Sequence, residues 1–235
     1  DTLVADCVGH HLTVAGDGDA FVSYDDSIYT MFLRCWGYET SDDVFDFWNG
    51  KNSFCIHCKA GPTSVGDANG FKKGSGQSGT GGHILLFDEA IDCGACGFDS
   101  NTGPVGSFHA YCQVTGAGYY GFYKDRSTSA DTYYSCEASG CGRGDWQLEG
   151  EYIRDDDFRP VVWADLPDWI NSAPERMQAI VREVLDSEPD PEPTPVRFVV
   201  GEGVDTLRVE MEQADVLKTI RDLSAKLLNG DFTGP

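Results

Sequence analysis

Nine cysteines are the residues of this chain whose type and spacing could most readily do chemistry. Four of them form two Cys-x-x-Cys pairs, Cys55 with Cys58 and Cys93 with Cys96. Two such pairs can supply four thiolates to a closed, tetrahedral zinc site of a structural kind. In a protein exported from the cytosol, the same residues would form disulfide bonds instead. We favour disulfides and keep a structural zinc site at these four cysteines as the alternative.

The disulfide interpretation takes in every cysteine of the chain. Nine thiols are hard to maintain in a reducing cytosol without a metal, so their number favours an oxidising compartment. The candidates are Cys7, Cys35, Cys55, Cys58, Cys93, Cys96, Cys112, Cys136 and Cys141. We therefore expect an extracellular, periplasmic or virion-surface protein. The zinc alternative implies an intracellular subunit of a larger complex.

Two enzyme classes also use such cysteines, and the flanking residues argue against both. The second pair follows an apolar run at residues 84–87 and resembles a thioredoxin-like active site, but a turn follows where that family requires a helix. His83 resembles the His-bearing strand of papain-like peptidases, with Cys35 or Cys55 as nucleophile. Neither cysteine opens a helical pattern, as that mechanism requires. We assign no catalytic residue, and a Cys/His hydrolase stays as a further alternative.

One short motif could mediate adhesion. Arg143, Gly144 and Asp145 directly follow Cys141 and resemble the integrin-binding tripeptide of adhesion proteins. A cation and a carboxylate on a tight, anchored loop would suit recognition of a receptor. Three residues recur by chance in unrelated proteins, so the motif is kept only as a candidate binding site.

The charge of the chain excludes several partners. Seventeen basic residues against thirty-nine acidic ones give a net charge of −22, which disfavours nucleic acids and anionic membranes. No run of about 18 apolar residues could span a bilayer. Acidic clusters at Asp17-Gly18-Asp19, Asp25-Asp26 and Asp155-Asp156-Asp157 could gather Ca²⁺, but they lack a calcium-loop pattern and suggest solvated surface. We expect no cofactor, with zinc as the main alternative and Ca²⁺ as a weaker one.

Residues 1–160 are expected to form a β-rich head domain that contains every cysteine. Short apolar or aromatic runs alternate there with Gly, Asp, Asn and Ser turns, which is typical of an antiparallel sheet or sandwich. Residues 61–82 are rich in glycine and predict a long loop between the two Cys pairs.

Three further segments are expected after the head. Residues 161–186 contain an amphipathic helix, because apolar residues from Met177 to Leu185 recur on one helical face. Residues 187–196 alternate proline with acids and predict a stiff spacer. Residues 197–235 show a ββα pattern. The predicted fold class is therefore α+β, with a disulfide-stabilised antiparallel head, a helix, a spacer and a small ββα unit.

This layout resembles, in architecture alone, surface adhesins and filamentous-phage attachment proteins, which join Cys-containing heads to Pro-rich linkers. The resemblance implies a secreted, non-enzymatic protein for binding, adhesion or assembly. Its head would bind a protein or a receptor, and its tail would anchor it in a homo-oligomer or a larger assembly. The alternatives remain a structural-zinc subunit of a complex and a Cys/His hydrolase.

Overall fold

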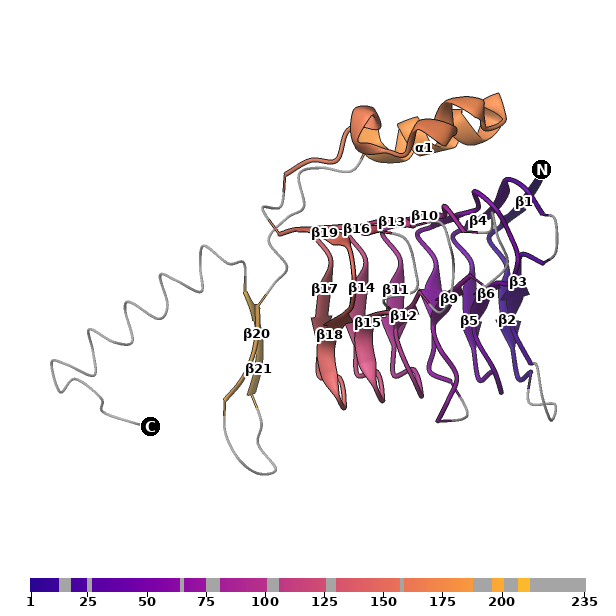
Figure 1. Cartoon of the computed structure of the whole chain (residues 1–235). Coiled ribbons are helices and arrows are strands. Elements are labelled where there is room, and N and C mark those ends of the chain that lie inside the picture. Colours follow the sequence, from indigo (N-terminus) through magenta and orange to yellow (C-terminus); the bar gives the residue numbers. More distant parts are fainter. Residues whose placement is uncertain are drawn as a thin grey trace, which may run out of the picture. The chain divides into compact units, whose positions relative to one another are not determined.

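Very short strands recur along residues 1–156, always in the same cyclic order of three. The first strand of each set joins a seven-stranded sheet, and the second and third join two six-stranded sheets, here named the first, second and third sheets. Every strand pairing within these three sheets is parallel. One set of three strands is therefore one coil, and the coils stack into a β-solenoid (Figure 1).

The strands divide among the sheets as follows. The first sheet contains β1 (Thr2–Ala5), β4 (Thr30–Leu33), β7 (Phe54–Ile56), β10 (Ile84–Leu86), β13 (Phe108–Ala110), β16 (Asp131–Tyr134) and β19 (Tyr152–Asp155). The second contains β2 (Val8–His10), β5 (Trp36–Tyr38), β8 (Lys59–Ala60), β11 (Glu89–Ile91), β14 (Gln113–Thr115) and β17 (Glu137–Ser139). The third contains β3 (Phe21–Val22), β6 (Phe45–Phe47), β9 (Phe71–Lys73), β12 (Phe98–Asp99), β15 (Tyr120–Lys124) and β18 (Gly144–Leu148).

The computed structural model describes residues 1–12, 18–24, 27–63, 66–74, 81–100, 106–125, 130–156 and 159–187, and the backbone of two later strands. Those strands, β20 (Val196–Val200) and β21 (Leu207–Met211), pair antiparallel. The chain divides into two compact units, residues 1–187 and 188–235. Residues 188–195 of the expected spacer lie outside the described residues, and so does the helix expected after β21.

The register of the strands gives the length of a coil. Ile84 pairs with Phe108, and Phe108 pairs with Thr132, so these two coils advance by 24 residues each (84 to 108 to 132). Insertions between strands lengthen other coils. Phe54 and Ile84 are also partners, although they are 30 residues apart (54 to 84). The repeat is thus regular in space but irregular in sequence.

The turn from the first to the second sheet places one non-glycine residue in the left-handed region of backbone conformation. Arg34, His57, Phe87 and Tyr111 have φ values of 51°, 53°, 56° and 56° there. This conformation costs a residue with a Cβ atom about 1–2 kcal/mol. Rings at successive corners stack, His57 on Phe87 at 5.0 Å and Phe87 on Tyr111 at 4.7 Å between centroids. Contact between neighbouring coils therefore offsets part of the backbone cost.

A column of aromatic rings runs through the interior along the third sheet. Successive rings are nearly parallel, with centroids 4.3–4.9 Å apart. Its members are Phe21, Phe45, Phe71, Phe98, Phe122 and Trp146. Offset stacking of this kind adds about 0.5–1.5 kcal/mol per pair to the burial of the rings. The column, together with buried cysteines, forms the core of the solenoid.

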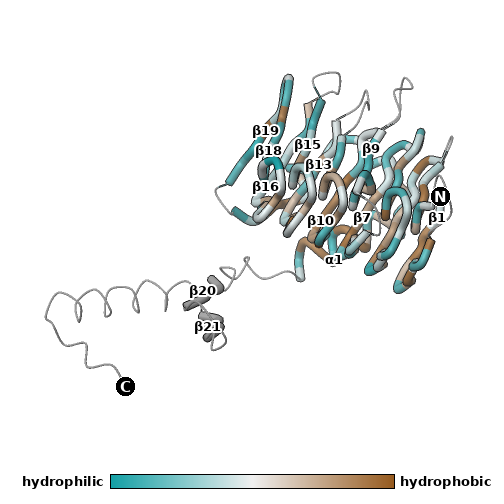
Figure 2. The backbone as a smooth tube through the Cα atoms, turned by 90° about the horizontal axis from the view of Figure 1, so that it is seen from below, coloured by the Kyte–Doolittle hydropathy of each residue, from teal (hydrophilic) through white to brown (hydrophobic). Residues whose placement is uncertain are grey.

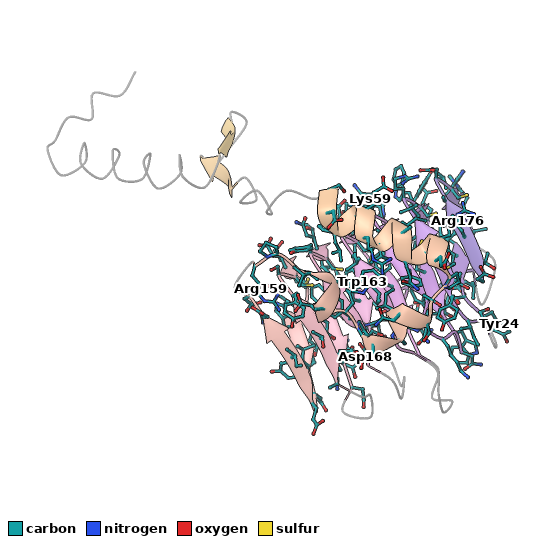
Figure 3. The ribbon with its side chains drawn as sticks, turned by 90° about the horizontal axis from the view of Figure 1, so that it is seen from above. Tyr24, Lys59, Arg159, Trp163, Asp168 and Arg176 are labelled. Atoms are coloured by element: carbon teal, nitrogen blue, oxygen red, sulfur yellow. The ribbon has the colours of Figure 1, made fainter. Side chains whose placement is uncertain are left out.

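The outer face of the first sheet is covered by the segment that follows the last coil. Two short 3₁₀ helices (Trp163–Asp165 and Asp168–Ser172) lead into α1 (Glu175–Ser187). Met177, Val181 and Val184 are buried on one side of α1 and belong to the same apolar cluster as outward-facing residues of β4, β7, β10 and β13. Figure 3 shows α1 lying along the sheet, and Figure 2 shows the hydrophobic residues of β7 and β10 beside it. Among the described residues, no helix is long and apolar enough to span a membrane.

The prediction of an antiparallel sandwich in an α+β fold was wrong. The strands of residues 1–156 pair in parallel, and helix is a minor component of the described residues. Alternating side chains and frequent turn residues mark short strands of either kind, so they do not reveal the direction of pairing. Direction is decided by contacts between residues about 24 positions apart, which local patterns do not report.

The prediction of disulfide bonds was also wrong. All nine cysteines lie within the described residues, and all nine are free thiols. Cys7, Cys35, Cys58, Cys112 and Cys136 each follow the left-handed corner residue of a coil. They therefore mark a repeated structural position, and four of them, all except Cys7, are buried. Free cysteine is among the most buried residue types and packs as a small hydrophobic residue.

Candidate functional site: an acidic pocket with aromatic walls

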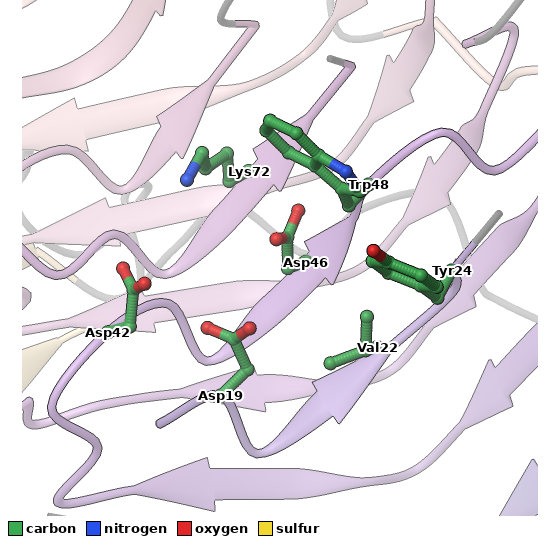
Figure 4. A pocket seen from close by; sticks show the side chains of 7 residues that line it. All are labelled: Asp19, Val22, Tyr24, Asp42, Asp46, Trp48 and Lys72. Carbon is green, nitrogen blue, oxygen red and sulfur yellow. The ribbon is translucent and has the colours of Figure 1, made fainter. Parts of the chain in front are cut away.

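A pocket of about 530 Å³ opens on the outer face of the third sheet, over the first three coils. Its walls combine acids, aromatic rings and one cation, as Figure 4 shows. The residues that line it are Asp19, Val22, Tyr24, Asp42, Asp46, Trp48 and Lys72. We call it the acidic pocket.

Alternation along the strands puts these side chains outside. In β6, Phe45 and Phe47 are fully buried in the interior, so Asp46 between them faces outward. In β9, Lys72 lies between two buried residues in the same way. Parallel register then places Val22, Asp46 and Lys72 in one outward row, each paired with the next. The floor of the pocket is therefore built by rigid strands.

Two carboxyl groups in the pocket each have one oxygen without a hydrogen-bond partner among the described residues. An oxygen of Asp19, one of Asp43 and one of Asp46 all lie within 4.8 Å of one another. Asp46 is only 7% exposed, and its Oδ1 atom has no hydrogen-bond partner among the described residues. Asp19 Oδ1 is likewise buried without a partner there. A buried, unpaired oxygen is costly, so each of these two carboxyls would be stabilised by an incoming hydrogen-bond donor.

The pKa values of both groups reflect this environment. Burial raises the pKa of Asp46 to about 7, and the charges of Asp43 and Asp19 add to the rise against the opposing effect of Lys72. Burial and the charge of Asp43 raise the pKa of Asp19 to about 6. Near neutral pH, the two carboxyls are therefore close to their titration points.

The one cation of the pocket is already engaged. Lys72 Nζ lies 2.7 Å from Asp43 Oδ2, while Asp43 Oδ1 accepts hydrogen bonds from the backbone and side-chain amides of Asn69. Burial alone would lower the pKa of Lys72, but the charge of Asp43 outweighs it and the pKa is raised. Asp43 is thus held by Lys72 through charge and by Asn69 through hydrogen bonds, so the Lys72 ammonium is engaged with Asp43.

Aromatic rings form the rest of the wall. Tyr24 is 58% exposed and Trp48 is half-buried, and the Lys72 ammonium lies 5.9 Å from the centroid of the Trp48 ring. Such rings attract cations through their electron-rich faces. Carboxylate oxygens alone would also suit a hard metal ion such as Ca²⁺. The rings add a preference for an organic cation, because a hydrated metal ion gains little from them.

The structure separates the four cysteines of the expected zinc site. Cys55 and Cys58 lie with Asp88, within 4.8 Å, rather than with Cys93 and Cys96. Burial raises the pKa of the Cys93 and Cys96 thiols to about 12, and it raises the pKa of the Cys55 and Cys58 thiols as well, so the two pairs differ in position rather than in acidity. The Gly-rich sequence between the two pairs contains β9, so it is not one long loop as expected. Cys55 and Cys58 lie in and after β7, in the first sheet, whereas Cys93 and Cys96 follow β11, at a different corner of the next coil.

The Arg143-Gly144-Asp145 motif is part of the solenoid wall. The Arg143 guanidinium lies 3.7 Å from the centroid of the Tyr119 ring, and Asp145 Oδ1 accepts the backbone N–H of Cys141 at 3.3 Å. Gly144 begins β18, which pairs with β15. Of the three residues, Arg143 lines a second pocket, together with Asp99, Tyr119 and Tyr120.

His83 is buried in the interior. Its side chain is 0% exposed, its Nδ1 atom accepts the backbone N–H of Ser53 at 3.2 Å, and its ring lies 4.8 Å from that of Phe47. Burial and the charge of Lys73 lower its pKa to about 3. The Cys35 and Cys55 thiols have raised pKa values, Cys35 through its hydrogen bond with Cys58 and Cys55 through burial. These groups are positioned as core residues.

The sequence analysis did not predict the acidic pocket, although it named one of the residues that line it. Asp19 belongs to an acidic cluster considered for Ca²⁺, whereas the other two clusters include residues outside the described part of the chain. Asp46, Trp48 and Lys72 gave no motif, because they are neighbours only across coils. The alternation of Phe45, Asp46 and Phe47 was the available signal for an outward acid on a buried strand.

No match to the chain was found among protein-family models, curated proteins or solved structures. The function is therefore argued from the geometry of the pocket.

Proposed function

We propose that this protein is a non-enzymatic binding protein whose acidic pocket receives a lysine or arginine side chain of a basic protein partner. The observation that carries the proposal is the pair of carboxyls of Asp19 and Asp46, which line an open pocket beside aromatic rings and each have one buried oxygen without a hydrogen-bond partner among the described residues. A cationic side chain supplies hydrogen-bond donors and positive charge to these oxygens. It also supplies an apolar stem for Trp48 and Tyr24.

The charge of the whole chain favours the same partner. A net charge of −22 attracts basic proteins over long distances and speeds their association at low salt. The pocket then supplies specificity, since its carboxyls are held on strands and its rings accept a flat guanidinium. The expectation of an exported protein rested largely on disulfides, and it remains a prediction without that support.

The test uses short capped peptides that carry one arginine or one lysine, with a neutral serine peptide for comparison. Binding is followed by nuclear magnetic resonance of the full chain. We expect the cationic peptides to shift resonances around the acidic pocket, and Asp46→Asn to weaken their binding at least tenfold. Ca²⁺ in the same assay shows whether a metal ion competes for the carboxyls.

The control removes one negative charge elsewhere. Glu151→Gln alters an exposed residue beside β19, coils away from the pocket, and should leave binding unchanged. Equal weakening by both substitutions would mean that bulk charge, not the pocket, attracts the peptide. Equal binding of the serine peptide would contradict the proposal outright.

A further inference from the structure

One acid interrupts the repeated cysteine position. Cys35, Cys58, Cys112 and Cys136 follow the left-handed corner in their coils, and Asp88 takes this position after Phe87. Asp88 is 1% exposed and lies among thiols. An ionised carboxylate in such a place is very costly unless a positive charge or several donors compensate it.

The described residues do not provide that compensation. Asp88 Oδ1 accepts the backbone N–H of Cys58 at 2.8 Å, while Oδ2 has no hydrogen-bond partner among them. Burial raises the pKa of Asp88 well above its usual range, and the Cys58 amide and Cys55 thiol oppose this only in part. The carboxyl is thus held in place by one oxygen and left unpartnered at the other.

Two thiols lie beside the Asp88 carboxyl. The sulfurs of Cys55 and Cys58 and an oxygen of Asp88 lie within 4.8 Å of one another, and all three residues are buried. We propose that these three residues bind Zn²⁺ inside the solenoid. Thiolate and carboxylate are ligands that zinc takes at about 2.0–2.3 Å, so three atoms at this spacing can share one ion.

Neighbouring groups orient the ligands. The backbone N–H of Cys35 donates to the Cys58 sulfur at 3.4 Å, and the Cys58 N–H fixes Asp88. Such contacts around a metal site hold its ligands in place and favour their charged forms. Cys35, whose thiol is hydrogen-bonded to that of Cys58, offers a further sulfur from the preceding coil. This site keeps the first Cys pair of the zinc hypothesis and replaces the second pair with Asp88.

Burial determines how the metal is gained and lost. Cys55 is 0% exposed and both other ligands are 1% exposed, so zinc enters while the chain folds. The native protein should therefore retain zinc in the presence of a chelator and release it on unfolding. A surface site formed by exposed ligands would lose its metal to the chelator directly.

The test measures zinc in the full chain refolded with a slight excess of Zn²⁺ and then treated with EDTA. We expect one zinc per chain, released to a colorimetric chelator only in denaturant. Asp88→Asn keeps the shape and the Cys58 contact but removes the charge, and it should reduce zinc at least tenfold. Asp88→Cys introduces the cysteine that the other coils have at this position, and it should retain zinc because a thiolate is also a zinc ligand. This variant keeps the proposal testable if Asp88→Asn does not fold.

The control distinguishes this site from the four-cysteine alternative. Cys93→Ser should retain one zinc per chain, because Cys93 belongs to another corner of the solenoid. Cobalt in place of zinc should show sulfur-to-metal absorption that strengthens in Asp88→Cys and persists in Cys93→Ser. Absence of zinc from the refolded wild-type chain would overturn the proposal, and so would loss of zinc on replacing Cys93.

Discussion

The outer faces of the first and third sheets are built alike and used differently. In both sheets, short parallel strands alternate residues between the interior and the outside. The first sheet turns Met31 and Ile84 outward, and α1 covers them. The third sheet turns Asp46 and Lys72 outward, and they border an open pocket. One coil geometry thus supports a sealed face that stabilises the protein and a polar face that is free to bind.

The largest effect is expected from breaking the sealed face. Val181 is 0% exposed in α1, and Val181→Asp should lower the free energy of unfolding by about 4 kcal/mol, because apolar burial is lost and a charge is forced against the sheet. Ala179→Asp is the matched control, since Ala179 is exposed on the same helix. Ala179→Asp should lower the free energy of unfolding by less than about 1 kcal/mol. Denaturant unfolding of both variants measures the difference.

On the open face, removing a charge should stabilise the protein. The pKa of Asp46 rises from 3.8 to about 7 on folding, so its native state holds the proton more tightly. The contribution of the Asp46 carboxyl to the free energy of unfolding is therefore most favourable below about pH 4, and it is lost as the pH rises through about 7. Asp46→Asn should raise the free energy of unfolding at about pH 8 by at most about 4 kcal/mol and change it little at about pH 4.

The measurement is urea unfolding of wild type and Asp46→Asn at both pH values. Equal stability differences at the two pH values would contradict a raised pKa. Together with weakened peptide binding, a gain at high pH would show that Asp46 is kept at a cost to stability, as is common for binding sites.

A smaller effect on stability is expected from the aromatic wall. Trp48→Ala removes a half-buried ring from the pocket and should change the free energy of unfolding by about 1 kcal/mol, while weakening arginine-peptide binding about tenfold. Trp36→Ala removes an exposed tryptophan of the second sheet and should leave binding intact. Titration with the arginine peptide separates the two. If the two variants bind the arginine peptide with the same affinity, Trp48 is not part of the binding site.

The interior between the two faces should be the least accessible region. Cys7 is the exposed thiol and Cys141 is partly exposed, whereas the other seven are buried. Without reductant or denaturant, an alkylating reagent should modify Cys7 readily and the buried thiols slowly. In denaturant, all nine should react without prior reduction. Mass spectrometry counts the modified cysteines. If all nine react only after a reductant is added, the cysteines are in disulfide bonds and this description of the interior is wrong.

Part of this architecture was visible in the sequence. Short β-strands, the turn residues and the apolar spacing of Met177, Val181 and Val184 are local patterns, and the structure contains strands and a helix at those places. The repeat was also present, as a cysteine after all but one of the left-handed corners that follow the first sheet and as an aromatic residue in each strand of the third sheet. Insertions and the replacement of a cysteine by Asp88 concealed its period.

The binding site could not be predicted in the same way. Val22, Asp46 and Lys72 become neighbours only through the parallel register of β3, β6 and β9. Without that register, Asp46 is one acid among thirty-nine. The zinc hypothesis shows the same limit, since spacing suggested Cys55 and Cys58 but only stacking of coils brought Asp88 to them.

The most direct test of the open face is the proton balance of binding. Titrating the arginine peptide into the full chain at about pH 6.5, in two buffers of different ionisation enthalpy, gives the number of protons exchanged. A cation between Asp19 and Asp46 lowers their raised pKa values, so the account predicts proton release and an affinity that increases from about pH 5 to about pH 8. Binding without proton release, at an affinity independent of pH, would contradict a ligand in the acidic pocket.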